Sequence, residues 1–143
     1  MAITQGMCTS FKVQLLNGTQ NFTSNTFKIA LYTSSATLGE STTAYSATNE
    51  VASTGNYTAG GNTLSVSVVP TSTGNVAFLS FANTTWANAT ITANGALIYN
   101  NTAANAAVAV LAFGGDKTST NGTFAINFPT ADSTSAIIRL TAS

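Results

Sequence analysis

The sequence predicts an all-β protein, an antiparallel β-sandwich of jelly-roll or Greek-key type with one short N-terminal α-helix. Seven or eight short segments are alternately or continuously apolar, and turn signals separate them roughly every eight to twelve residues. Only one segment, near the N-terminus, has the spacing of an amphipathic helix. At 143 residues, the chain is expected to form a single domain over residues 1–143.

Charged residues make up 6% of the chain, compared with about 25% in an ordinary soluble domain. Their formal charges sum to zero, and we expect no basic patch that could bind nucleic acid. A surface without net charge also resists self-association weakly, which favours a subunit that packs against other subunits. The charged residues are Lys12, Lys28, Glu40, Glu50, Asp116, Lys117, Asp132 and Arg139.

Residues 5–17 hold the helical pattern. An apolar residue recurs every four positions from Met7 to Leu15 and defines a stripe along one side of the helix. Thr4 is the expected N-cap, and Gly18 is the expected residue after the C-cap. So short a helix is not stable alone, so we expect it to cover an open end or face of a sheet.

Residues 27–32 alternate apolar with other residues and predict a half-buried strand. Residues 33–62, which follow, have little periodicity, and so long a loop in a compact domain is unusual. Two interpretations carry equal weight. The segment is either a solvated loop or a contact arm for a partner, with Tyr45, Glu50 and Tyr57 as the candidate contact residues.

Residues 64–68 and 76–81 predict the clearest hairpin in the sequence. The first strand is expected to end at Pro70, and residues 73–75 are expected to form the turn.

Residues 86–99 predict the central strand of the fold. From Ile91 to Tyr99 its apolar residues occupy every second position, so they share one face of an extended chain. Asn94-Gly95 is also the dipeptide of a type I′ turn, and a hairpin is therefore the alternative. We favour one long strand with a glycine bulge at Gly95, because a two-residue turn would leave arms of only four or five residues.

Residues 106–113 form the longest apolar run and predict a neighbouring strand that is buried on both faces. Two glycine-containing segments, residues 114–117 and 121–122, are expected to break the chain into further short strands. These strands are expected over residues 124–128 and 136–140.

Groups suited to catalysis are scarce. Histidine is absent, which removes the commonest general base and metal ligand. Glu40 and Glu50 could meet within the long loop, but solvated loop carboxylates are far more common. Asp116 and Asp132 could contribute to a calcium site, although turn capping is the commoner role. We therefore assign no catalytic, cofactor-binding or metal-binding residue and expect that the protein is not an enzyme.

Neither export nor membrane insertion is expected. The N-terminal residues lack the basic and apolar regions of a signal peptide, and no apolar run reaches the ~18 residues of a membrane helix. Cys8 is the single cysteine, which rules out an internal disulfide, and its apolar neighbours predict a buried, unreactive thiol.

Several segments resemble small structural proteins encoded in tailed-bacteriophage genomes. The segments that carry the resemblance are FKIALYTSSATL (27–38), YSATNEV (45–51), NYTAGGNTL (56–64), ITANGALIYNNT (91–102), AVAVLAFGGDKTSTNGTFAINFPT (107–130) and AIIRL (136–140). The resemblance implies a virion structural protein. Such proteins include head decoration (cement) proteins, which commonly bind as trimers at junctions between capsid subunits, and minor tail or fibre components. None of the segments is a chemical motif, so no site residues carry over.

The leading hypothesis is a head decoration protein that binds the major capsid protein as a homo-oligomer, expected to be a trimer. It would be part of the virion, which is assembled in the host cytoplasm, and would stabilise the shell through many weak contacts. The alternative is a minor tail or fibre-associated module whose Tyr45 and Tyr57 contact the host surface or glycans. An exported adhesin subunit ranks third and an enzyme last. Neither a nucleic acid nor a membrane is expected as a partner, and no cofactor is expected.

Overall fold

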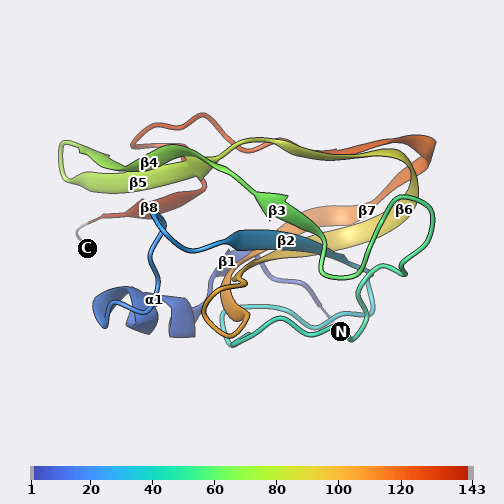
Figure 1. Ribbon diagram of the computed structural model, residues 1–143, viewed down its shortest axis with the longest axis horizontal. Coiled ribbons are helices and arrows are strands. Elements are labelled where there is room, and N and C mark those ends of the chain that lie inside the picture. Colours follow the sequence, from blue (N-terminus) through green and yellow to red (C-terminus); the bar gives the residue numbers. More distant parts are fainter. Residues whose placement is uncertain (1, 142–143) are drawn as a thin grey trace.

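The structure, a computed structural model, describes residues 2–141 (Figure 1). It contains a five-stranded sheet in the order β1-β7-β6-β2-β3 and a three-stranded sheet in the order β4-β5-β8, and neighbouring strands are antiparallel throughout. The predicted all-β class with one short helix is therefore confirmed. In chain order the elements are β1 (Gly6–Met7), α1 (Thr9–Leu16), β2 (Phe27–Tyr32), β3 (Asn62–Leu64), β4 (Val66–Thr73), β5 (Val76–Phe81), β6 (Thr84–Asn100), β7 (Ala106–Ile126) and β8 (Ile138–Leu140).

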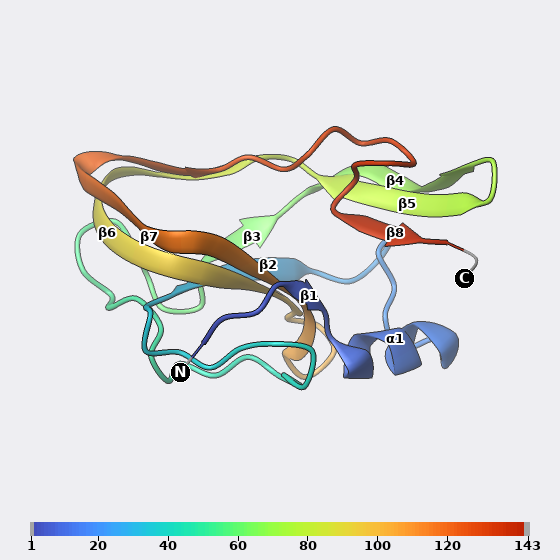
Figure 2. The same cartoon turned by 180° about the vertical axis from the view of Figure 1, so that it is seen from behind.

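The two longest strands, β6 and β7, pair into a ribbon that dominates the fold. In Figures 1 and 2 this ribbon runs out along the large sheet, bends at its far end and returns above it. The predicted single central strand is confirmed, since β6 continues through Gly95 with a register shift between Ala93 and Gly95. A Cβ at Gly95 would lie 2.6 Å from the carbonyl oxygen of Leu111, which explains why glycine stands at this position.

The predicted breaks at residues 114–117 and 121–122 are wrong, because β7 runs through both. At the first, residues 112–117 of β7 oppose residues 93–95 of β6, so β7 carries extra residues in a bulge. Two glycines lie in this bulge, Gly114 with a φ of 75° and Gly115 with a φ of 151°, and other residues rarely adopt these values. Pairing with β6 resumes on both sides, so these glycines bend the strand instead of ending it.

The predicted half-burial of the strand over residues 27–32 is also wrong. In β2, five of the six residues are buried, and only Lys28 is partly exposed. β2 lies inside the large sheet between β6 and β3. A strand that is covered on both faces needs apolar residues at odd and at even positions, because successive side chains point to opposite faces. The predicted double burial of residues 106–113 holds for residues 106–110, whereas residues 111–113 are partly exposed.

The predicted hairpin is confirmed as β4 and β5, with two corrections. Its first strand begins at Val66, because Leu64 belongs to β3 in the large sheet, and its turn is the two residues Gly74-Asn75, because Thr73 still pairs with Val76. Gly74 has a φ of 60°, as the first central residue of a type II′ turn requires. The first strand does not end at Pro70, because Pro70 lies at a register irregularity of an edge strand, where a missing N–H is tolerated. β8 covers only part of residues 136–140, since the N–H of Ala136 donates to the carbonyl of Asp132 in the preceding turn (3.2 Å).

The helix is shorter than the predicted span of residues 5–17. Gly6–Met7 instead pairs with β7 as the edge strand β1, and Cys8, not Thr4, is the N-cap. The N–H of Cys8 continues this pairing by donating to the carbonyl of Val108 (2.9 Å). The neighbouring strand therefore competes successfully for residues whose apolar spacing also fits a helix.

The prediction for the C-terminal end of the helix is confirmed. Gly18 follows the C-cap with a φ of 81°, as expected for a left-handed residue after a helix. Phe11 is the one fully buried residue of α1, so the helix is attached to the core along a narrow strip. Cys8 is buried as well, in agreement with its predicted packing role.

Candidate interaction surface

The candidate contact residues of the long loop lie together, but their polar atoms are bonded within the protein. The Glu50 carboxylate accepts hydrogen bonds from the hydroxyls of Tyr45 (2.6 Å) and Tyr57 (2.7 Å) and from the N–H of Gly60 (2.7 Å). The Tyr57 hydroxyl also accepts a hydrogen bond from the N–H of Leu31 on β2 (2.9 Å). These residues form what we call the Glu50 cluster, which ties the loop to the large sheet.

The remaining tyrosines join the same cluster, so all four tyrosines of the chain take part. The hydroxyl of Tyr32 donates to the carbonyl of Ser46 (2.7 Å), and the hydroxyl of Tyr99 donates to the carbonyl of Gly60 (2.7 Å). The ring of Tyr45 stacks on that of Tyr99, with 4.7 Å between centroids. Tyrosines on the strands and in the loop thus hold a segment with little regular structure in one conformation.

The environment of the cluster keeps the tyrosines protonated. Burial, followed by the nearby charge of Glu50, raises the pKa of Tyr99 to about 12. Burial and then the hydrogen bond to Glu50 also raise the pKa of Tyr45 and of Tyr57 above the ordinary value of 10. These hydroxyls therefore remain donors to the carboxylate at neutral pH.

The structure shows how far the single chain exposes the candidate contact residues. Tyr57 is 1% exposed, so its ring is buried inside the protein, and a contact role for the loop stays a prediction. Tyr45 and Glu50 are partly exposed, but each satisfies the other's polar group. The expectation that Glu50 is a solvated loop carboxylate is wrong for the same reason.

The other carboxylates have separate partners. Glu40 lies 3.8 Å from the ammonium of Lys12 at the surface, and Asp116 accepts a hydrogen bond from Asn94 (2.9 Å). Asp132 caps a turn, as predicted, by accepting the N–H groups two and three positions later (2.9 and 2.6 Å), and these bonds lower its pKa. Within residues 2–141, no three His, Cys, Asp or Glu residues gather where a metal ion could be held, and no helix is long and apolar enough to span a membrane.

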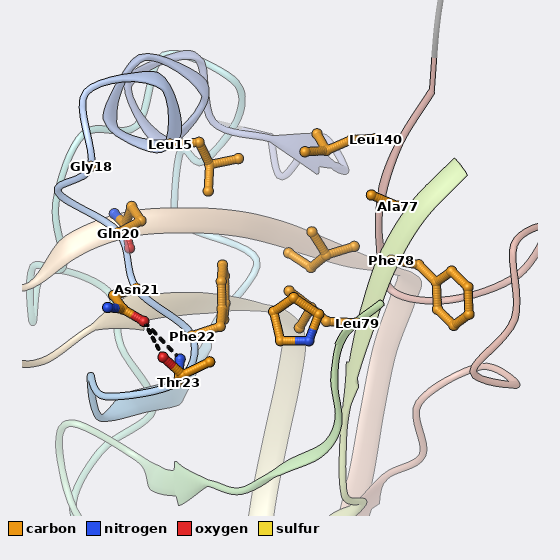
Figure 3. Close-up of a pocket in the computed structure, with 12 residues that line it drawn as sticks. Leu15, Gly18, Gln20, Asn21, Phe22, Thr23, Ala77, Phe78, Leu79 and Leu140 are labelled. Atoms are coloured by element: carbon orange, nitrogen blue, oxygen red, sulfur yellow. Dashed lines mark hydrogen bonds between the residues drawn. The ribbon is translucent and has the colours of Figure 1, made fainter. Parts of the chain in front are cut away.

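An apolar groove of about 350 Å³ opens where α1 and the segment after it face the small sheet (Figure 3). One wall consists of side chains from α1 and residues 18–23, and the other comes from β4, β5 and β8. The apolar side chains that line it include Leu15, Phe22, Ala77, Leu79, Ile138 and Leu140. The groove is thus an end of the hydrophobic core that the described chain leaves open.

The elements that form the walls of this groove also carry exposed apolar side chains. The large hydrophobic residues most exposed in the described chain are Leu16 (90%), Val69 (60%), Val13 (56%) and Leu140 (45%). Val13 and Leu16 lie on α1, Leu140 lines the groove, and Val69 precedes the groove residue Pro70. We call Val13 and Leu16 the α1 ridge.

Sequence reasoning did not single out the groove or the ridge. The signal it had was the pair Leu15-Leu16, because Leu15 belongs to the apolar stripe and Leu16, about 100° further round the helix, lies at its border. The tertiary structure decides that Leu15 takes the inner direction and Leu16 the outer one.

Comparisons of the chain with protein-family models, with curated proteins and with solved structures found no match in any of the three.

Proposed function

We propose that the protein is a non-enzymatic structural component of a bacteriophage virion, a head decoration (cement) protein that binds the major capsid protein as a homo-oligomer. The observation that carries this proposal is the apolar groove with its exposed ridge, in a chain of only 6% charged residues. An uncovered apolar end on a weakly charged surface is typical of a subunit that is buried among neighbours. The resemblance of its segments to small phage structural proteins points in the same direction.

The physical logic of decoration suits such a surface. A protein that binds only the assembled shell shifts assembly toward completion by mass action, and repetition over the lattice multiplies weak contacts. Contacts between uncharged surfaces are also insensitive to salt, because there is little Coulomb attraction to screen. In this proposal the trimer is the expected oligomer, and the protein reaches the virion in the host cytoplasm.

The proposal includes a finer description of the fold. Two antiparallel sheets, with a ribbon that returns above the larger one, support an open β-sandwich of jelly-roll or Greek-key type. The open end of this sandwich would coincide with the groove.

The test is binding to capsids assembled without the decoration protein. Purified protein is mixed with such shells and sedimented at low and at high sodium chloride. We expect saturable binding, in hundreds of copies per shell, that changes little with salt and raises the temperature at which the shells disassemble. Absence of binding, or a handful of copies per intact virion, would contradict head decoration.

The tail or fibre alternative is not favoured by the geometry. It needs aromatic rings presented to sugars, whereas Tyr57 is buried and the ring of Tyr45 is stacked on Tyr99.

A further inference from the structure

Asparagine is followed directly by glycine at three places in the chain, residues 17–18, 94–95 and 121–122. Such pairs are prone to spontaneous deamidation, because glycine has no side chain to hinder its own backbone nitrogen. That nitrogen loses its proton and bonds to the side-chain carbonyl carbon of asparagine, while the carbon–nitrogen bond of the amide breaks and ammonia leaves. The resulting succinimide takes up one water molecule and opens to aspartate or isoaspartate. The reaction needs no reagent other than water.

The reaction also requires the backbone of the pair to rotate. A succinimide ring needs the glycine nitrogen and the Cβ of asparagine on the same side of the Cα–C bond. At Asn17 the ψ of 5° turns the nitrogen of Gly18 away from that Cβ. The rate at each pair in the folded protein therefore depends on the free energy needed to open the structure locally around it.

The pair Asn17-Gly18 is the least restrained of the three. Both residues are exposed at the C-terminal end of α1, where Asn17 is the C-cap. A Cβ on Gly18 would have no atom within 4 Å, and the N–H of Gly18 donates no hydrogen bond to any residue of 2–141. The nearest hydrogen bonds come from Thr19, which donates its N–H to the carbonyl of Gln14 (2.9 Å) and its hydroxyl to Oδ1 of Asn17 (2.6 Å). Helix ends with so few bonds open at little cost.

The pair Asn94-Gly95 is the most restrained. Gly95 is buried in the middle of β6 and pairs with Tyr32 on one side and with Ala112 on the other. The amide of Asn94 donates a hydrogen bond to Asp116 (2.9 Å). Rotation here would break the large sheet on both sides of its central strand, so folding should protect this pair strongly.

The pair Asn121-Gly122 lies within β7 and is restrained on one side. Gly122 pairs with Ala89 of β6, and the N–H of Asn121 donates to the hydroxyl of Thr90 (3.0 Å). Asn121 is as exposed as Asn17, but its movement would open the ribbon of β6 and β7. Exposure alone therefore does not distinguish these two pairs, whereas strand pairing does.

We propose that Asn17 is a site of spontaneous deamidation in the folded protein, and that strand pairing protects Asn94 and Asn121. The unmodified chain has 4 basic and 4 acidic residues, so one new carboxylate gives it a formal net charge of −1. The new charge lies at the negative end of the α1 dipole and next to Gly18, one of the uncharged residues that line the groove. Isoaspartate also lengthens the main chain by one carbon between α1 and Gly18. This inference is independent of the proposed function.

The first experiment compares the three sites within one chain. Purified protein is incubated at mildly alkaline pH, once folded and once in urea, and peptide mapping by mass spectrometry measures aspartate and isoaspartate at each site over time. The rate in urea is the reference for each site, because the unfolded chain lacks strand pairing. We expect folding to slow the reaction at Asn94 and at Asn121 at least about tenfold more than at Asn17.

The second experiment follows the acidic form of the folded protein by anion-exchange chromatography. Asn17→Gln should prevent its formation over the same period, because the longer side chain would have to close a six-membered ring. Asn121→Gln is the matched control at a similarly exposed position and should leave its formation unchanged. Far-ultraviolet circular dichroism verifies that both variants fold.

Three outcomes would overturn the inference. They are equal slowing of the three sites by folding, faster modification of Asn94 or Asn121 than of Asn17 in the folded protein, and an acidic form that persists in Asn17→Gln. Neither experiment involves capsids, so failure here leaves the proposed function untouched.

Discussion

Replacing Glu50 with alanine tests whether the Glu50 cluster holds the long loop to the large sheet. The change removes the acceptor of three hydrogen bonds of 2.6–2.7 Å. Tyr45 is partly exposed, so its hydroxyl can turn to water. The hydroxyl of Tyr57 and the N–H of Gly60 belong to buried residues and lose their acceptor. Each unsatisfied buried donor costs about 1–3 kcal/mol, so we expect the free energy of unfolding to fall by about 3–4 kcal/mol.

Urea unfolding, followed by the fluorescence of Trp86, measures this loss, because Trp86 packs against Tyr57 with ring centroids 5.7 Å apart. For a domain of this size the loss corresponds to a decrease in Tm of about 10 °C. Glu50→Gln is the matched control: it keeps one acceptor oxygen and should cost only about 1–2 kcal/mol. A loss below about 1 kcal/mol for Glu50→Ala, or equal losses for both variants, would refute the proposed role of the carboxylate.

Three further predictions concern glycine, tyrosine and cysteine. Gly61→Ala should lower the free energy of unfolding in urea by more than about 3 kcal/mol, because a Cβ there would lie 1.7 Å from the carbonyl oxygen of Ile29. Gly74→Ala is the control: Gly74 has a φ of 60° and open space around it, so the loss should be about 1 kcal/mol. Similar losses for the two variants would contradict this prediction. The free energy of unfolding should hold up to about pH 10 and fall as pH rises through 12, because folding raises the pKa of Tyr99 from 10 to about 12 and so favours its protonated form. Tyrosinate absorbance that titrates near pH 10 in the folded protein would contradict this prediction. Burial also raises the pKa of Cys8 to about 11, so iodoacetamide should modify it quickly only after unfolding; rapid alkylation of the folded chain would contradict its burial.

The local features of the fold were predictable where one physical constraint dominated. The parity of apolar residues through Asn94-Gly95 outweighed a strong turn signal, and β6 is indeed one strand. The hairpin of β4 and β5 followed from apolar strand patterns on both sides of a turn signal at residues 73–75. The burial of Cys8 followed from its apolar neighbours.

Other features depended on competition that the sequence alone does not display. Gly6–Met7 fits a helical stripe, but the backbone of β7 lies within reach and pairs with it. Gly114 and Gly115 signal a turn, yet β6 offers pairing on both sides, so they become a bulge. In each case a neighbouring strand far away in sequence supplies the hydrogen bonds that decide the outcome.

By itself, the sequence determined that this protein is an all-β domain with few charges and no histidine, because composition and periodicity are properties of the chain. Only the tertiary structure decided that Glu50 accepts hydrogen bonds from Tyr45 and Tyr57 and that Leu16 is exposed on α1, next to the groove residue Leu15. The reason is physical: a side chain's burial depends on what packs against it, and at both sites the packing partners come from distant segments of the chain.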